Sequence, residues 1–315
     1  IMVQTTVGGS LGETDDDLRW LVDYIQTNDP DGEGYYQAYT HIAPDETIME
    51  ETDEEHFYQI GGATIFDNNG VKELQMLWGE MDNHEGKMTR TGTCLAVYSL
   101  EGQPGNSTYL KRISKNEEFN TDDVGYGSTI WKDEDGHIYL YVTENNRPLV
   151  ARTTTHDLTS EWEYYIRDLS GNFMWQKMYP TKEERTRSTI MENNYVCSMP
   201  QIFKKGDYYY MIGQAVSYGH SVYLYRGETP YGPFTDQKIL FNVPYAVDKI
   251  GNQYYKNLLR VNLHLELARE GELVFSTNTD ADTAGDNFDF PGSADFCRPY
   301  FYRVFNWESI YDEDE

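Results

Sequence analysis

Two glutamates occupy equivalent places in neighbouring segments of the sequence. Glu80 ends the segment KELQMLWGE (72–80) and Glu144 ends GHIYLYVTE (136–144), and in each an alternating apolar series precedes the carboxylate. Strict alternation predicts half-buried strands, so each carboxylate is expected where its strand leaves the core. Two carboxylates can hydrolyse a glycosidic bond, at ~5–5.5 Å for retention or ~6.5–9.5 Å for inversion of configuration. We therefore predict Glu80 and Glu144 as general acid and base or nucleophile. A solvated strand end is the alternative for either one alone.

Further polar residues are expected at the same end of these strands. Gln214 stands at the place of Glu80 and Glu144 in a third segment, and Asn278 lies at the end of a fourth. His264 and Glu266 are two residues apart, so on one strand their side chains would share a face. Glu266 is therefore a reserve catalytic acid. The side chains predicted to orient the ligand or to stack on it are those of Tyr126, Ser128, Gln201, Gln214, His264, Asn278, Arg298 and Trp78.

The elements that position these residues recur along the chain. Four similar segments begin at positions 72, 136, 206 and 271, so their spacing is nearly constant. Each has an upstream strand joined through a turn rich in Asp, Asn, Lys or Gly, and one or two strands downstream. A fixed period with four strands per unit is typical of a β-propeller. The expected fold is all-β, a five-bladed β-propeller with four-stranded antiparallel blades. The regular period argues against an immunoglobulin-like sandwich.

The predicted domain organisation is one propeller over residues 1–315. Residues 1–55 would supply a partial first blade, and residues 56–310 four full blades. We expect a monomer. In a propeller, the loop leading into the first strand of a blade and the loop leaving the second strand open on one face. Polar residues at those two places are therefore the candidates for the site.

The charge of the chain excludes several classes of partner. With 25 basic and 53 acidic residues the net charge is −28, which repels nucleic acid and anionic lipid surfaces. The sequence contains no run of eighteen apolar residues, so it predicts no membrane-spanning helix. The composition suits a secreted, periplasmic or cell-surface protein. Three widely spaced cysteines define neither a disulfide framework nor a zinc site.

No cofactor or catalytic metal is predicted. Two acidic stretches, Asn28 to Glu33 and Asp280 with Asp282, Asp286 and Asp289, could hold a structural calcium ion, although neither has the complete EF-hand spacing. Turns in an acidic protein are the favoured explanation for both stretches. The expected partner is an oligosaccharide or polysaccharide.

The later part of the chain resembles a known enzyme clan in several short motifs. The residues TPYGPF (229–234) resemble a P-x-G-P-F/W turn, and ELVFSTN (272–278) resembles an ELL-x-S-Y-x-x-N strand. Between them stand His264 and Glu266, and CRPYF (297–301) resembles a closing Y-R-P-x-F strand. Over residues 56–306 the chain resembles the five-bladed propeller glycoside hydrolases, the arabinanases and β-xylosidases. It is most similar to their endo-D-arabinanase-like relatives.

The resemblance implies a glycoside hydrolase acting on plant or microbial polysaccharide. Relatives in this clan have an early F-G-D-T segment whose acid is important. Here LGET (11–14) stands instead, with Glu13 in place of the aspartate. Glu13 is thus a further catalytic candidate. The alternative is a non-catalytic glycan-binding propeller that has lost the first-blade acid, and a protein-interaction propeller is a third possibility.

Overall fold

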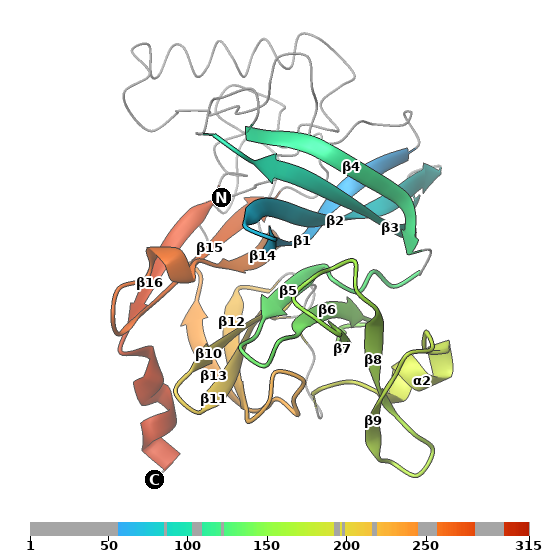
Figure 1. The fold of residues 1–315 in the computed structure, drawn as a ribbon. Coiled ribbons are helices and arrows are strands. Elements are labelled where there is room, and N and C mark those ends of the chain that lie inside the picture. The colour runs from blue at the N-terminus through green and yellow to red at the C-terminus, as the bar shows by residue number, and fades with distance from the viewer. Residues whose placement is uncertain are drawn as a thin grey trace.

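The computed structural model describes residues 56–84, 87–102, 109–120, 123–191, 196, 199–215, 219–244, 257–280 and 299–314. These residues form four antiparallel sheets arranged as a β-propeller (Figure 1). The sheets correspond to predicted blades 2 to 5, and they are numbered so below. Predicted blade 1, in residues 1–55, lies outside the described residues. Within the described part, no helix is long and apolar enough to cross a bilayer.

Blades 2 and 3 each have their strands side by side in chain order, starting from the strand nearest the axis. Blade 3 has five strands, one more than predicted, because the chain turns back once more after β8. The strands of blade 2 are β1 (His56–Asn68), β2 (Val71–His84), β3 (Lys87–Leu100) and β4 (Tyr109–Asn120). Those of blade 3 are β5 (Thr129–Lys132), β6 (Ile138–Glu144), β7 (Arg147–Thr153), β8 (Trp162–Arg167) and β9 (Phe173–Gln176).

Blades 4 and 5 follow the same plan. Blade 5 has three strands among the described residues, where four per blade were predicted. Blade 4 contains β10 (Gln201–Lys205), β11 (Tyr208–Gln214), β12 (Ser221–Gly227) and β13 (Thr235–Asn242). Blade 5 contains β14 (Asn257–Leu263), β15 (Glu272–Asp280) and β16 (Tyr300–Phe305). The short helical elements are α2 (Lys182–Arg187), η1 (Leu265–Leu267) and η4 (Trp307–Asp314).

The blades adhere through apolar side chains that alternate along their second strands. Ile138 and Leu140 of β6 pack toward Leu77 of blade 2, whereas Tyr139 and Tyr141 pack toward blade 4. β6 therefore contributes to two interfaces, which explains why its residues are apolar on both sides of the sheet. Burial of these side chains stabilises the ring by roughly 1.5–3 kcal/mol for each large side chain.

The inner strands approach one another closely near the axis. The amide nitrogen of Gly62 on β1 donates a hydrogen bond to the carbonyl of Gly127, at 2.7 Å. Gly127 has φ +93°, and a Cβ atom there would lie 2.3 Å from Cδ1 of Leu77. A side chain at this position would be strained by the positive φ and would displace the Leu77 side chain, which is why the residue is glycine.

A buried carboxylate links blade 3 to blade 4. Asp133 accepts hydrogen bonds from Tyr209 Oη at 2.9 Å and from Trp131 Nε1 at 3.0 Å. Burial and the neighbouring Asp133 raise the pKa of Tyr209, so its hydroxyl remains a donor. We expect Tyr209→Phe to lower the free energy of unfolding by about 1.5–3 kcal/mol, because it removes a hydrogen bond to a buried charge. Urea unfolding checks this, with Tyr208→Phe at the exposed neighbouring position as the control; equal losses in both variants would contradict it.

Candidate functional site

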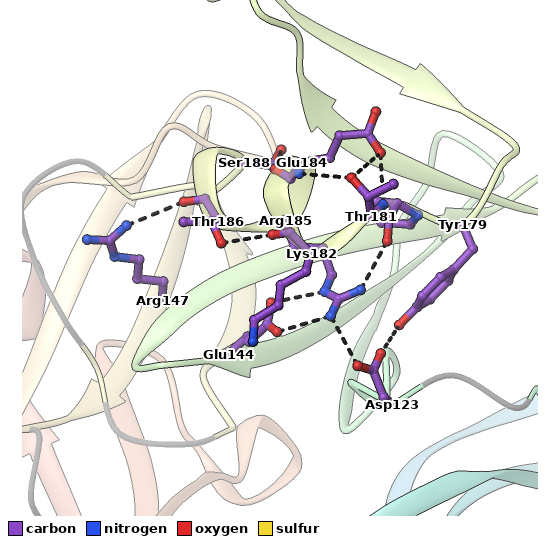
Figure 2. Close-up of polar contacts among 11 residues, drawn as sticks. Asp123, Glu144, Arg147, Tyr179, Thr181, Lys182, Glu184, Arg185, Thr186 and Ser188 are labelled. Carbon is purple, nitrogen blue, oxygen red and sulfur yellow. Dashed lines mark hydrogen bonds and ion pairs between the residues drawn. The ribbon is translucent and has the colours of Figure 1, made fainter.

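The side chain of Glu144 lies in a group of charged residues at one end of blade 3. Arg185 Nε donates to Glu144 Oε2 at 3.0 Å, and Arg185 Nη2 donates to Oε1 at 3.2 Å. The same Nη2 donates to Oδ2 of Asp123, also at 3.2 Å (Figure 2). The two carboxylate oxygens nearest this nitrogen are therefore separated by at most twice that distance. Asp123 and Glu144 form a carboxylate pair held by one guanidinium.

Local structure positions each member of the group. Glu144 ends β6 just before a two-residue turn in which Asn145 (φ 52°) and Asn146 (φ 61°) are both left-handed. Asparagine tolerates this conformation, and such turns match the twist of a hairpin. Asp123 lies in the loop leading into β5, at the end of the blade where β6 finishes. These are the two places where the propeller pattern predicts site residues.

Arg185 is delivered by helix α2, which follows β9. The helix begins with a capping box, in which Thr181 and Glu184 satisfy one another's backbone amides. Arg185 is only 4% exposed, and its Nη1 donates to the carbonyl of Pro180 at 3.0 Å. The ring of Tyr179 lies 5.6 Å from the guanidinium, and its hydroxyl donates to Asp123 Oδ1 at 3.0 Å. The group is therefore rigid on the arginine side.

The two carboxylates differ in their access to solvent. The Glu144 side chain is 20% exposed and accepts a guanidinium hydrogen bond at each oxygen. Asp123 is 69% exposed and accepts one hydrogen bond at each oxygen, from Arg185 and Tyr179. Because guanidinium has donors and no acceptor, both carboxylates contact Arg185 through oxygens that act as acceptors. Each oxygen also keeps a further lone pair for another partner.

Glu80 lies in a different group, on the other side of blade 2. One cluster within blade 2 contains Leu74, Met76 and Trp78, which lie on the same side of β2 as Glu80. Leu77, on the opposite side of β2, packs toward blade 3. The Glu80 side chain therefore points away from blade 3, while Glu144 points toward blade 2. A Cβ atom on Gly92 would lie 2.7 Å from Glu80 Oε2, so the carboxylate reaches outward over β3. The register gives no support to Glu80 and Glu144 as one pair.

The surroundings of Glu80 combine burial with nearby charges. Partial burial, followed by the charge of Glu117, raises the pKa of Glu80, although Lys115 and Arg90 oppose this. Lys115 Nζ lies 2.5 Å from Glu117 Oε1, which also accepts a hydrogen bond from Tyr58 Oη at 3.2 Å. Glu80 is thus a carboxyl whose protonated form is favoured on folding.

A pH-dependent stability follows from the raised pKa of Glu80. Below the pKa that Glu80 has in the unfolded chain, its carboxyl is protonated in both states and does not change the free energy of unfolding. As pH rises through the higher pKa of the folded state, ionisation of the half-buried carboxyl lowers stability. We expect Glu80→Gln to raise the Tm at pH 7 and to leave it unchanged near pH 3.5. Scanning calorimetry across this range checks it, with exposed Glu134→Gln as the control; a constant difference at all pH values would contradict it.

Gln214 ends β11 and Asn278 lies near the end of β15, but their side chains do not match Glu144 in direction. Tyr210 and Ile212, in phase with Gln214, pack toward blade 5, and Gln214 Nε2 donates to the carbonyl of Leu258 on β14. Asn278 is likewise out of phase with Leu273 and Phe275, which pack toward blade 4. A one-residue offset in strand phase turns both amides to the other face. Gln214 is buried and links two blades.

Gln201 also connects blades 4 and 5. Its Nε2 donates to Oδ1 of Asn262 at 3.3 Å, and its Oε1 accepts from the amide of Leu263 at 2.8 Å. Ser128 donates to the carbonyl of Gly125 at 2.9 Å in the turn that leads into β5. Both polar groups therefore have partners within the protein in the ligand-free state.

His264 and Glu266 interact, but not on a strand. β14 ends at Leu263, and Glu266 lies in the short helix η1, so the predicted strand was wrong at this point. His264 Nε2 lies 2.8 Å from Ser276 Oγ, and Nδ1 lies 3.3 Å from Glu266 Oε1. The backbone amide of His264 donates a hydrogen bond to the carbonyl of Val274, close to the turn between β14 and β15. That turn is at the end of the blade opposite the loop that leads into β14.

The two predicted aromatic platforms are buried. Tyr126 packs edge-on against Tyr164 at 5.1 Å between ring centroids, and Trp78 lies in the core of blade 2. Neither ring offers a face to a ligand, because the neighbouring strands cover both. Glu13 and Arg298 lie outside the described residues, as do the predicted calcium stretch 28–33 and residues 282–289. Within the described ranges, no three His, Cys, Asp or Glu side chains are grouped as metal ligands.

Asp123 and Arg185 were missed by the sequence reasoning. Asp123 had a usable signal, since it stands in the loop before an inner strand, where site residues were expected. Arg185 had none, because it lies 41 positions from Glu144 in a segment between blades. Helix α2 brings it back over the end of blade 3.

The described fold and this end of blade 3 define a β-propeller with a paired-carboxylate site. Residues 1–307 match the family described as a domain of unknown function, DUF5005, and the chain belongs to that family. Comparison with curated proteins gave no significant match.

Solved structures include a close relative. A presumptive hydrolase from Bacteroides ovatus is 53% identical, with a TM-score of 0.78, over 93% of this chain and 73% of its own. An exo-β-1,3-galactanase from Phanerochaete chrysosporium is 13% identical, with a TM-score of 0.39, over 78% of this chain and 46% of its own. An α-L-arabinanase from Cellvibrio cellulosa is 13% identical, with a TM-score of 0.38, over 77% and 72%. The last two are too distant to inform the chemistry of this site.

Proposed function

We propose that the chain is a secreted, periplasmic or cell-surface glycoside hydrolase acting on plant or microbial polysaccharide, of the endo-D-arabinanase-like kind. The observation that carries the proposal is the pair Asp123 and Glu144, whose nearest oxygens each accept a 3.2 Å hydrogen bond from Arg185 Nη2. The separation of these two oxygens, at most twice that length, is compatible with the ~5–5.5 Å of retaining enzymes. The 53% identity to a presumptive hydrolase supports the reaction class.

The two carboxylates take different roles in this proposal. Glu144, ionised and fixed by Arg185, attacks the anomeric carbon as the bond to the leaving oxygen breaks. Asp123, the more exposed, protonates that leaving oxygen. Water then attacks the anomeric carbon, returns a proton to Asp123 and releases the sugar from Glu144. Arg185 acts as a positioning residue for both.

A non-catalytic glycan-binding propeller is the second candidate. In this candidate the pair has no chemical role, and all four of its oxygens accept hydrogen bonds from Arg185 or Tyr179. Such a network also suits a purely structural ion pair that joins α2 to blade 3.

Incubation with a broad polysaccharide panel separates the two candidates. The proposal expects new reducing ends with at least one polymer, and NMR of the first product should show retention of the anomeric configuration. Affinity electrophoresis on the same panel records binding. Glycan binding without any cleavage would establish the binding propeller and overturn the hydrolase.

A further inference from the structure

The outermost strand of blade 3 has an unusual edge. β9 pairs only with β8 among the described residues, so one side of it carries unpaired backbone groups. The hairpin closes with the amide of Asp168 donating to the carbonyl of Asn172 at 2.9 Å. In an antiparallel ladder hydrogen-bonded pairs alternate, so the N–H and C=O groups of Phe173 and Trp175 point away from β8. This edge is a template for another strand.

The other outer strands of the described blades are protected by charge. β4 contains lysine, arginine and glutamate, β13 contains Asp236 and Lys238, and β16 contains Arg303. Charged residues on edge strands prevent strand-to-strand association between molecules. β9, with the sequence FMWQ, has none. Of the four described blades, only blade 3 therefore lacks a charged residue on its outer strand.

Apolar side chains are exposed along the same hairpin. Leu169 and Met178 are largely exposed on either side of β9, and Met174 is 48% exposed within it. Phe173 stacks on Tyr165, with 4.9 Å between centroids, and Trp175 packs against Tyr165 at 4.8 Å. These ring contacts hold the strand in one conformation, which reduces the entropy lost when a partner binds. Methionine and aromatic residues are also enriched in protein interfaces.

The local charge shows which partner fits. The whole chain has a net charge of −28, so two copies repel each other over most of their surface. Residues 147–187, which include the hairpin, contain seven basic and six acidic residues, so this region is nearly neutral. Two copies can therefore approach here with little repulsion. A two-fold axis also makes one antiparallel edge complementary to itself.

We infer that β9 pairs with β9 of a second copy in antiparallel fashion, joining two copies of blade 3 into one continuous sheet. The main-chain groups of Phe173 and Trp175 make the new hydrogen bonds. Leu169, Met174 and Met178 become covered by the partner. The inference is independent of the proposed glycan chemistry, since it uses the outermost strand β9, whereas Glu144 ends β6 and Asp123 lies in the loop before β5, at the inner end of the sheet. It departs from the monomer expected from the sequence.

Analytical ultracentrifugation of the full chain tests the pairing, at protein concentrations of about 1–100 μM and at low and moderate salt. The wild type is expected to sediment as a dimer. The dimer fraction should rise with salt, because screening weakens the repulsion between the two negatively charged copies. Met174→Glu should weaken the dimer at least tenfold, since it places two like charges close to the two-fold axis. Ile113→Glu is the matched control, because Ile113 is 56% exposed on the outer strand of blade 2.

Two results would overturn the inference. One is a wild-type protein that stays monomeric up to the highest concentration. The other is a dimer that survives in Met174→Glu as well as in Ile113→Glu. Equal Tm values for the two variants show that any difference in mass reflects association and not unfolding.

Discussion

Replacing Glu144 by glutamine is expected to reduce polysaccharide cleavage by on the order of 10³-fold or more, because the amide can neither attack the anomeric carbon nor act as a base. The amide has a single acceptor oxygen, so one of the two hydrogen bonds from Arg185 is lost and a lower Tm is expected as well. Initial rates should therefore be measured well below the Tm, with glycan binding as evidence that the site is intact.

Glu163→Gln is a matched control for this experiment. Glu163 has the same 20% side-chain exposure as Glu144 and also pairs with an arginine, Arg152, at 2.7 Å. It lies on β8, away from the carboxylate pair, so its replacement should preserve the cleavage rate. Asp123→Asn should reduce cleavage comparably to Glu144→Gln, with a smaller change in Tm because Asp123 is mostly exposed. Cleavage that persists in Glu144→Gln would remove Glu144 from the reaction.

Replacing Arg185 by alanine is expected to lower the free energy of unfolding by about 3–5 kcal/mol. The guanidinium is buried and makes hydrogen bonds to Glu144, to Asp123 and to the carbonyl of Pro180. Its removal leaves the Glu144 carboxylate without its counter-ion in a mostly buried place, and detaches α2 from blade 3. Urea denaturation gives the change directly.

Arg187→Ala provides the comparison on the same helix. Arg187 is more exposed, its ion pair with Glu184 is long, at 3.9 Å, and its Nε donates to the carbonyl of Arg167, so a smaller loss of about 1–2 kcal/mol is expected. Arg185→Lys should fall between the two variants, since lysine keeps the charge and loses the bidentate fork. Equal stability of Arg185→Ala and Arg187→Ala would show that the pair with Glu144 contributes little.

The strand pattern was accessible from the sequence because alternation and turn residues are local properties. The nearly constant spacing of the four similar segments located β2, β6, β11 and β15 within a few positions, and predicted the propeller arrangement. β9 escaped because four residues with no alternating continuation carry too little signal. The end of β14 was placed too late, since His264 and Glu266 follow the strand and the chain turns into η1.

Side-chain direction depends on strand phase, which only the packed blades decided. The Glu80 side chain points to the side of blade 2 away from blade 3, and the Glu144 side chain points to the side of blade 3 that faces blade 2. These are equivalent sides of the two blades, as their matched positions suggested. Gln214 and Asn278 are one residue out of that phase, and a shift of one residue reverses the face. Spacing measured from the turn cannot detect this, because hairpin turns differ in length between blades.

What the sequence determined by itself is the repeated pattern of antiparallel strands and the place of Glu144 at a strand end, since both follow from the two-residue period of a strand. What only the tertiary structure decided is the partner of that carboxylate. Arg185 and Asp123 are distant from Glu144 along the chain and come together through the path of α2 and the loop before β5. The burial of Tyr126 was decided in the same way, because it packs against Tyr164 and Tyr179, whereas Trp78 is covered by the neighbouring strands of its own blade.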